Sequence, residues 1–168
     1  MNLEKLNQPD VDRARAELMR CCGSSAWVER MLSSRPFGDA AHVLELAEEI
    51  WFDLSEEDWR EAFTHHPRIG DVESLRKKFA STATWAESEQ KGTRSATPEV
   101  LERLAAGNSE YEKKFGYIYI VCATGKSAEE MLALCKDRLR NDAPVEISNA
   151  AEEQRRITHL RLQKILEQ

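Results

Sequence analysis

Residues 117–122 read YIYIVC, and this run decides the fold class. It is rich in β-branched and aromatic residues, which favour extended chain, and it is the one strand-like segment in 168 residues. A lone strand cannot form a sheet. We therefore predict an all-α protein, in which residues 117–123 form either a buried extended segment or a helix built from poor helix formers.

Around this run, apolar residues recur at helical spacing and clear start signals precede the helices. Ser55 with Asp58 and Ser127 with Glu130 fit the capping box, and Thr97-Pro98 joins an N-cap to a proline at the first helical position. The helices we predict span residues 10–22, 25–32, 39–54, 55–65, 72–79, 85–91, 98–115, 127–140 and 144–168. Because no repeat or linker divides the chain, residues 1–168 are predicted to form a single domain, a multi-helix bundle.

Composition excludes several classes of function. The chain is 41% hydrophobic and 32% charged, and its net charge of −6 is spread without a basic stripe. Nucleic acid and anionic membrane are therefore poor partners. We expect a cytoplasmic protein, because no apolar run approaches the roughly 20 residues that span a bilayer and the N-terminus lacks a signal-peptide core. The four cysteines form no CxxC pair, so we expect reduced thiols and no metal site.

Residues 64–71, THHPRIGD, interrupt the helical pattern. Pro67 takes His66 out of helical geometry, while Gly70 permits a tight turn. A titratable imidazole fixed on a rigid turn suits proton transfer near neutral pH. The alternative is a helix terminus followed by a polar loop, with His65 still in the helix and Asp71 capping the next one.

Three other stretches hold candidate binding groups. In residues 85–90, WAESEQ, one carboxylate could orient an imidazole, and Gln90 could read a ring amide or urea group; the alternative is an acidic helix surface. In residues 115–126, an extended backbone could read a planar heterocycle, unless the stretch is only an apolar core element. In the last helix, Arg161 borders the apolar side and could present a bidentate fork to an anion.

Together these pieces resemble a known family. HHPRIGD, SEQ, YEKKFGYIYIVCATGKSAEEML and AAEEQRRITHLRL follow one another in this order over roughly residues 60 to 166. The set is similar to the OHCU decarboxylases, which convert 2-oxo-4-hydroxy-4-carboxy-5-ureidoimidazoline (OHCU) to (S)-allantoin in urate breakdown. The resemblance implies an all-helical enzyme without a cofactor, commonly a homodimer, that acts on this small ureide.

The resemblance also assigns roles to individual residues. It places catalysis on His66 and Glu89. It also puts Ala86 where relatives often have serine, so a substrate hydrogen bond made there is either lost or replaced by one from Ser88. The substrate-binding residues that it implies are Pro67, Ala86, Ser88, Gln90, Tyr119, Ile120, Val121, Cys122, Ala123 and Arg161. No cofactor is needed, because the departing carboxylate is adjacent to a ring C=N that accepts the electron pair.

Two other classes of function stay open at this stage. A metal-dependent hydrolase of a related ureide could use His65, His66, Asp71 and His159, although no HExxH or HxH spacing supports it. A helical interaction module without catalysis would explain the long last helix and its charged faces. It gives no reason for an apolar run beside a rigid histidine turn.

Overall fold

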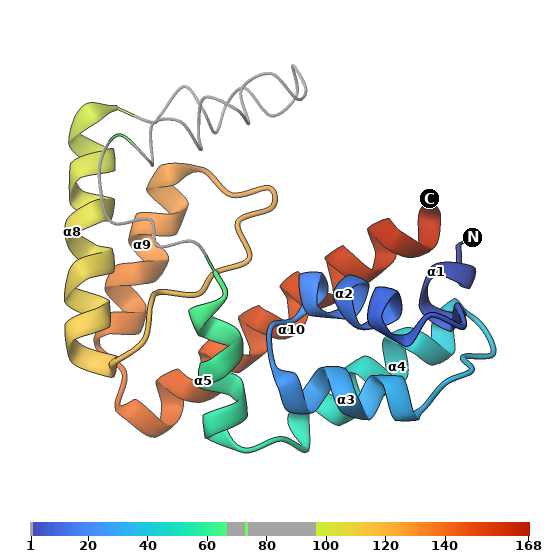
Figure 1. The fold of residues 1–168 in the computed structure, drawn as a ribbon. Coiled ribbons are helices and arrows are strands. Elements are labelled where there is room, and N and C mark those ends of the chain that lie inside the picture. The colour runs from blue at the N-terminus through green and yellow to red at the C-terminus, as the bar shows by residue number, and fades with distance from the viewer. Residues whose placement is uncertain (1, 67–72, 74–96) are drawn as a thin grey trace. The chain divides into compact units, whose positions relative to one another are not determined.

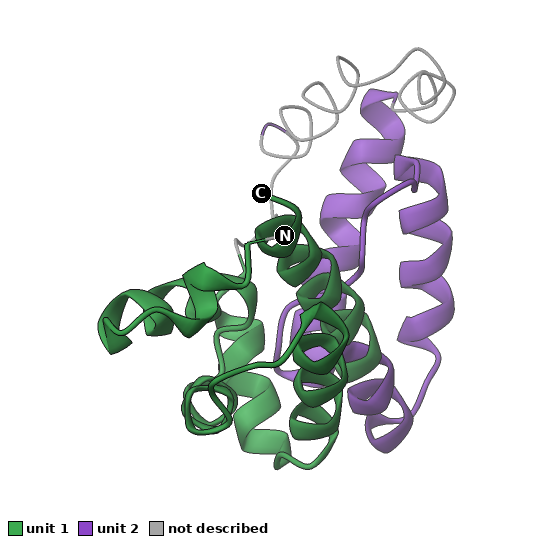
Figure 2. Ribbon diagram, turned by 90° about the vertical axis from the view of Figure 1, so that its right-hand side faces the viewer, with its two compact units in different colours: residues 1–66, 151–168 green, residues 67–150 purple. Residues whose placement is uncertain are grey.

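The computed structural model describes residues 2–66, 73 and 97–168 (Figure 1). The chain divides into two compact units. The first contains residues 1–66 and 151–168, and the second contains residues 67–150 (Figure 2). We describe each unit by itself.

The first unit is built from helices whose starts are fixed by polar caps. They are α1 (Glu4–Asn7), α2 (Val11–Cys21), α3 (Ser25–Ser33), α4 (Ala40–Phe52), α5 (Glu56–Thr64) and the larger part of α10 (Ala143–Glu167) (Figure 1). Asp10, Ser24, Asp39 and Ser55 each accept a hydrogen bond from a backbone N–H in the first turn of the helix that follows. Such caps satisfy donors that the helix itself leaves unpaired.

Three tryptophan side chains tie the helices of the first unit together. The indole N–H of Trp27 in α3 donates to the Ala47 carbonyl in α4 at 3.0 Å. Trp51 in α4 donates to the Ala151 carbonyl in α10 at 2.9 Å, and Trp59 in α5 donates to the Trp51 carbonyl at 2.8 Å. Each ring thus buries a large apolar surface while its N–H is satisfied. These bonds fix the position of α5, the helix that leads to His66.

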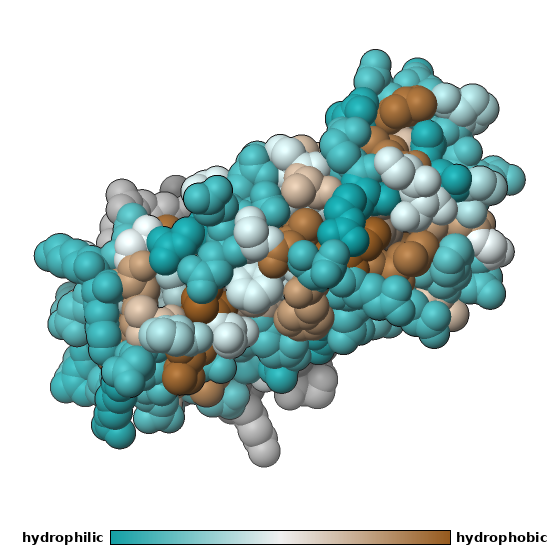
Figure 3. All heavy atoms as spheres, turned by 90° about the horizontal axis from the view of Figure 1, so that it is seen from below, coloured by the Kyte–Doolittle hydropathy of each residue, from teal (hydrophilic) through white to brown (hydrophobic). Residues whose placement is uncertain are grey.

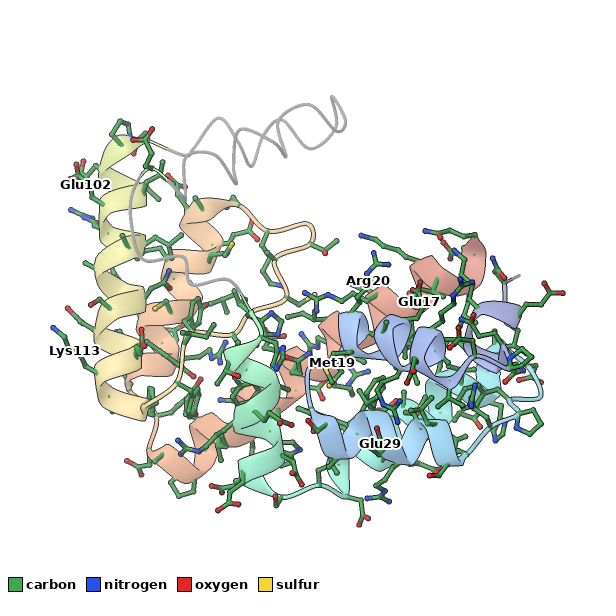
Figure 4. The ribbon with its side chains drawn as sticks, viewed as in Figure 1. Glu17, Met19, Arg20, Glu29, Glu102 and Lys113 are labelled. Carbon is green, nitrogen blue, oxygen red and sulfur yellow. The ribbon has the colours of Figure 1, made fainter. Side chains whose placement is uncertain are left out.

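The second unit contains α8 (Pro98–Phe115), α9 (Ala128–Leu139) and the first residues of α10. Helices α8 and α9 pack against each other around a core of Leu101, Leu104, Ala105, Ala128, Met131 and Leu132. The opposite side of α8 is charged, and Glu102 and Lys113 point away from α9 there (Figure 4). Gly116 ends α8 with φ of 82°, a left-handed conformation that favours glycine.

A buried ionic cluster, which we call the Arg138 cluster, joins three parts of the second unit. It consists of Arg138 in α9, Glu146 in α10 and Tyr111 in α8. Arg138 Nε lies 2.6 Å from Glu146 Oε1, and the Tyr111 hydroxyl donates to the same oxygen at 2.5 Å. Glu146 is fully buried and Arg138 is 8% exposed. The two opposite charges are paired, so neither is an isolated buried charge, which would be strongly destabilising.

The observed helices confirm most of the sequence predictions in the described part of the chain. Ser55 and Asp58 form the expected capping box, Thr97 caps α8, Ser127 caps α9, and α10 runs for 25 residues. Residues 117–123 are non-helical, with Ile120 and Cys122 buried, so the extended alternative is the correct one. The fold class is all-α. Helix α1 was not predicted, and the helices expected at 72–79 and 85–91 lie outside the described residues.

Few large apolar side chains are highly exposed in the part of the chain that the structure describes. Figure 3 shows hydrophilic residues over most of the face that it presents. Within residues 2–66 and 97–168, the large apolar residues with high exposure are Val11, Phe52 and Val145. Of the helices in this part of the chain, none combines the length and the apolar character needed to cross a membrane.

The Arg138 cluster predicts a large cost for neutralising its acid. Glu146→Gln would leave the Arg138 charge buried without its counter-ion, so the free energy of unfolding should fall by about 3 kcal/mol. The matched control is Glu99→Gln, which removes an exposed ion pair to Arg103 on α8 and should cost less than about 1 kcal/mol. Urea denaturation followed by circular dichroism measures both values. Equal losses in the two variants would contradict the stabilising role of the cluster.

Candidate functional site

His66 lies directly after the end of α5, as predicted. Helix α5 ends at Thr64, and His65 is its C-cap residue rather than part of the helix. The backbone N–H of His66 donates to the Phe63 carbonyl at 3.3 Å, which holds the turn against the last residues of α5. The two histidines differ in environment, because His65 is exposed and His66 is partly buried. Of the pair, His66 is therefore the one held within the structure.

The imidazole of His66 contacts a buried amide that the sequence interpretation missed. His66 Nε2 lies 2.5 Å from Gln154 Oε1, and Gln154 in α10 is fully buried. Gln154 Nε2 in turn donates to the Thr158 hydroxyl at 3.0 Å. A signal was present in the sequence, because Ala150, Gln154, Thr158 and Leu162 recur every four residues and form a buried stripe of α10. A polar residue in such a stripe requires a partner.

Gly23 is the residue that allows the turn at His65 and His66 to pack. A Cβ atom built on Gly23 would lie 2.4 Å from Cγ and 2.5 Å from Cβ of His65. Real Cβ atoms do not approach that closely, so no larger residue fits without a shift of the backbone. Gly23 follows the C-cap residue of α2, and its lack of a side chain also makes room for the histidine pair.

Arg161 lies at the end of α2. Its Nη1 donates to the carbonyls of Arg20 and Cys21 at 3.3 and 3.4 Å. These carbonyls belong to the last turn of α2, where a helix leaves acceptors unpaired and attracts positive charge. Arg20 itself is labelled in Figure 4, on α2. Within the described part of the chain, Nε and Nη2 of Arg161 have no hydrogen-bond partner, so one edge of the guanidinium could take an anion.

Residues 119–123 show the alternation of an extended segment with one side in the core. Ile120 and Cys122 are buried, whereas Tyr119, Val121 and Ala123 are partly exposed. The Tyr119 hydroxyl donates to the Met131 carbonyl at 3.2 Å, and the Arg138 guanidinium carbon lies 4.8 Å from the Tyr119 ring centre. The tyrosine ring is therefore packed on the second unit. This arrangement suits recognition of a ligand by backbone groups, as the sequence predicts.

Two carbonyls of the same segment are fixed from within the second unit. Arg138 Nη1 donates to the Ile120 carbonyl at 2.5 Å, and Lys126 Nζ donates to the Cys122 carbonyl at 2.7 Å. The Arg138 cluster therefore supports the extended backbone as well as the packing of α8, α9 and α10. None of its three residues appeared among the predicted site residues, because their sequence positions are far apart.

The remaining predicted site residues belong to the part of the chain that the structure does not describe. Pro67, Ala86, Ser88, Glu89 and Gln90 lie outside the described residues, as does Asp71. Within residues 2–66, 73 and 97–168, no group of three or more His, Cys, Asp or Glu side chains could hold a metal ion. The described candidate groups in the first unit are thus His66 with Gln154, and Arg161. Taken by itself, the second unit offers the extended segment.

Comparison with known proteins gives a consistent set of matches. A model of the OHCU decarboxylase family matches residues 7–163. The chain is 40% identical over 148 residues to the uric acid degradation bifunctional protein TTL of Arabidopsis thaliana, which covers 86% of this chain and 45% of that protein. It is 28% identical over 136 residues to the 2-oxo-4-hydroxy-4-carboxy-5-ureidoimidazoline decarboxylase of Amia calva, which covers 80% of this chain and 77% of that one.

A solved structure matches as well. The crystal structure of an OHCU decarboxylase in the presence of (S)-allantoin aligns with a TM-score of 0.74 and 36% identity, covering 90% of this chain and 98% of that one. The chain spans less than half the length of two bifunctional relatives, 45% of the Arabidopsis protein and 32% of one from Bacillus sp. strain TB-90.

The close approach of Gly23 and His65 predicts that this glycine cannot be replaced. Gly23→Ala should lower the free energy of unfolding by about 1–3 kcal/mol, because an added methyl group overpacks the turn. The control is Gly38→Ala in the same unit, where a Cβ would meet only His42 Nδ1 at 4.0 Å and the backbone φ is ordinary. Urea denaturation compares the two. Equal stability of the Gly23 and Gly38 variants would show that the turn has more room than the structure indicates.

Proposed function

The chain belongs to the OHCU decarboxylase family, and on that premise we propose that it converts OHCU to (S)-allantoin. The observation that carries the proposal is the placement of His66, an imidazole at the end of a helix with one ring nitrogen held by a buried amide. Such a group can exchange a proton near neutral pH from a fixed position. The choice of substrate and product is supported by the name of the Amia calva relative and by the matched crystal structure of an OHCU decarboxylase in the presence of (S)-allantoin.

The reaction that we propose needs no external electron sink. The C–C bond to the substrate carboxylate breaks, and its electron pair forms a double bond to the neighbouring ring carbon as the C=N pair moves onto nitrogen. That nitrogen takes up a proton. Loss of the hydroxyl proton and protonation of the ring carbon then give allantoin, and protonation on one face sets its chirality. The protein's tasks are to orient the carboxylate out of the ring plane, exclude water and deliver protons.

We assign these tasks to the residues that fit the family pattern. His66 exchanges protons with the substrate, and Glu89 orients or assists it. Arg161 suits a substrate oxygen, because the described partners of its guanidinium engage only Nη1. The backbone of Tyr119, Ile120, Val121, Cys122 and Ala123 suits the ureido and ring amides, since the segment is extended and partly exposed. The other substrate-binding residues in the proposal are Pro67, Ala86, Ser88 and Gln90.

We further propose a homodimer that acts in the cytoplasm as one catalytic domain of residues 1–168. The family resemblance supports the dimer and the single domain. All four cysteines are free and buried, which is in keeping with a reducing compartment.

The assignment of His66 predicts a large and selective loss of activity. The His66→Ala variant should consume OHCU, freshly generated from urate by upstream enzymes, about 100-fold or more slowly than the wild type. A general acid–base group contributes a rate factor of that size. The control is His42→Ala, which removes an exposed histidine of α4 whose Nδ1 accepts a bond from the Gly38 N–H. This variant should retain wild-type turnover.

The decisive comparison is between the two histidine variants after both have been shown to fold by circular dichroism. A folded His66→Ala protein with turnover within about twofold of wild type would remove His66 from the mechanism.

A further inference from the structure

The hydrogen bond between His66 and Gln154 determines which nitrogen of the imidazole carries the proton. Gln154 Oε1 is 2.5 Å from His66 Nε2, and the amide is completely buried. A glutamine carbonyl oxygen accepts hydrogen bonds and never donates them. If this oxygen faces the ring, Nε2 must therefore be the protonated nitrogen, in the neutral imidazole as well as in the imidazolium.

The orientation of the amide is settled by its neighbour on α10. Gln154 Nε2 lies 3.0 Å from the hydroxyl oxygen of Thr158, one helical turn away and only 6% exposed. The structure thus places the amide nitrogen of Gln154 on the side of the Thr158 hydroxyl and the amide oxygen on the side of the imidazole.

The hydrogen bonds of the amide then follow from its orientation. The Thr158 oxygen accepts from the Gln154 amide N–H. With its nitrogen committed to Thr158, the amide turns its oxygen to His66. The opposite orientation, with the Gln154 NH₂ against the ring and its oxygen against the hydroxyl, is not the one in the structure. Each of these groups is buried or partly buried, so two donors or two acceptors facing each other would destabilise the fold.

We propose that Gln154 is a positioning residue that holds His66 in the Nε2–H tautomer, so that proton exchange with the substrate takes place at Nδ1. The lone pair of a neutral Nε2–H imidazole lies on Nδ1, which is its basic nitrogen. A neutral amide fixes the tautomer without adding the negative charge that a carboxylate partner would bring. The proton-exchange part of the inference rests on the proposed function, whereas the tautomer itself does not.

The direct test is nitrogen-15 NMR of protein labelled in its four histidines, above the pH at which the imidazoles are charged. The His66 signals are identified by their loss in His66→Ala. We expect His66 Nε2 to be of the protonated type and Nδ1 of the unprotonated type. The reverse assignment in wild-type protein overturns the inference, with no variant needed.

Variants then connect the tautomer to turnover. Gln154→Met keeps a side chain of similar length but removes the acceptor, so His66 should populate both tautomers. Its kcat for OHCU should fall by about 10- to 100-fold with KM little changed, because a misplaced catalytic group costs about that much. The control is Thr158→Ser, which keeps the hydroxyl and should preserve both the tautomer and kcat. A Gln154→Met protein with a pure Nε2–H tautomer, or with wild-type kcat, contradicts the role of Gln154.

Failure of this inference and failure of the proposed function give different results. Wild-type turnover of OHCU together with an Nδ1–H tautomer refutes the role of Gln154 and leaves the decarboxylase proposal intact. An Nε2–H tautomer without any turnover of OHCU supports the hydrogen-bond assignment and refutes the proposed function instead.

Discussion

The polar side chains that α10 buries must each find a partner, and this constraint organises both units. Glu146 pairs with Arg138, and Gln154 pairs with His66. Both α10 residues are fully buried, so each would carry a large desolvation cost if its partner were lost. In both cases the partner belongs to, or directly supports, a segment of the candidate site. The helix therefore supports candidate groups within each unit and also forms part of each core.

The same constraint explains how a small helical protein can hold groups in place for the reaction that we propose. Such a reaction depends on orientation, because the substrate itself accepts the electrons. In the first unit, α5 brings His66 to its position and the buried amide fixes its ring. In the second, Arg138 holds the Ile120 carbonyl in an otherwise irregular segment. Each contact gives a group in a turn or an irregular segment a second point of attachment.

The sequence predicts elements well where the physical cause is local. Caps such as Ser55 and Thr97 act within three residues, so the helix starts could be read from the chain. Helix α1 was missed because it has four residues and no side-chain cap. For residues 117–123 the composition left two alternatives, and only packing could decide between them.

Site residues were predictable to the extent that they belong to a continuous motif. His66 could be singled out because Pro67 follows it. Gln154 and Arg138 were missed, since their partners lie 88 and 18 residues away in sequence and no local pattern records such a pairing. The family resemblance names Glu89 and the residues around it, and those assignments remain predictions.

The central claim is that this chain decarboxylates OHCU and protonates the product on one face. It is tested most directly by generating OHCU from urate in situ and following the circular dichroism of the allantoin that forms. The account predicts that a signal of (S)-allantoin develops faster with the protein than without it and in proportion to its concentration. Racemic allantoin, formed at the same background rate with or without the protein, would contradict it.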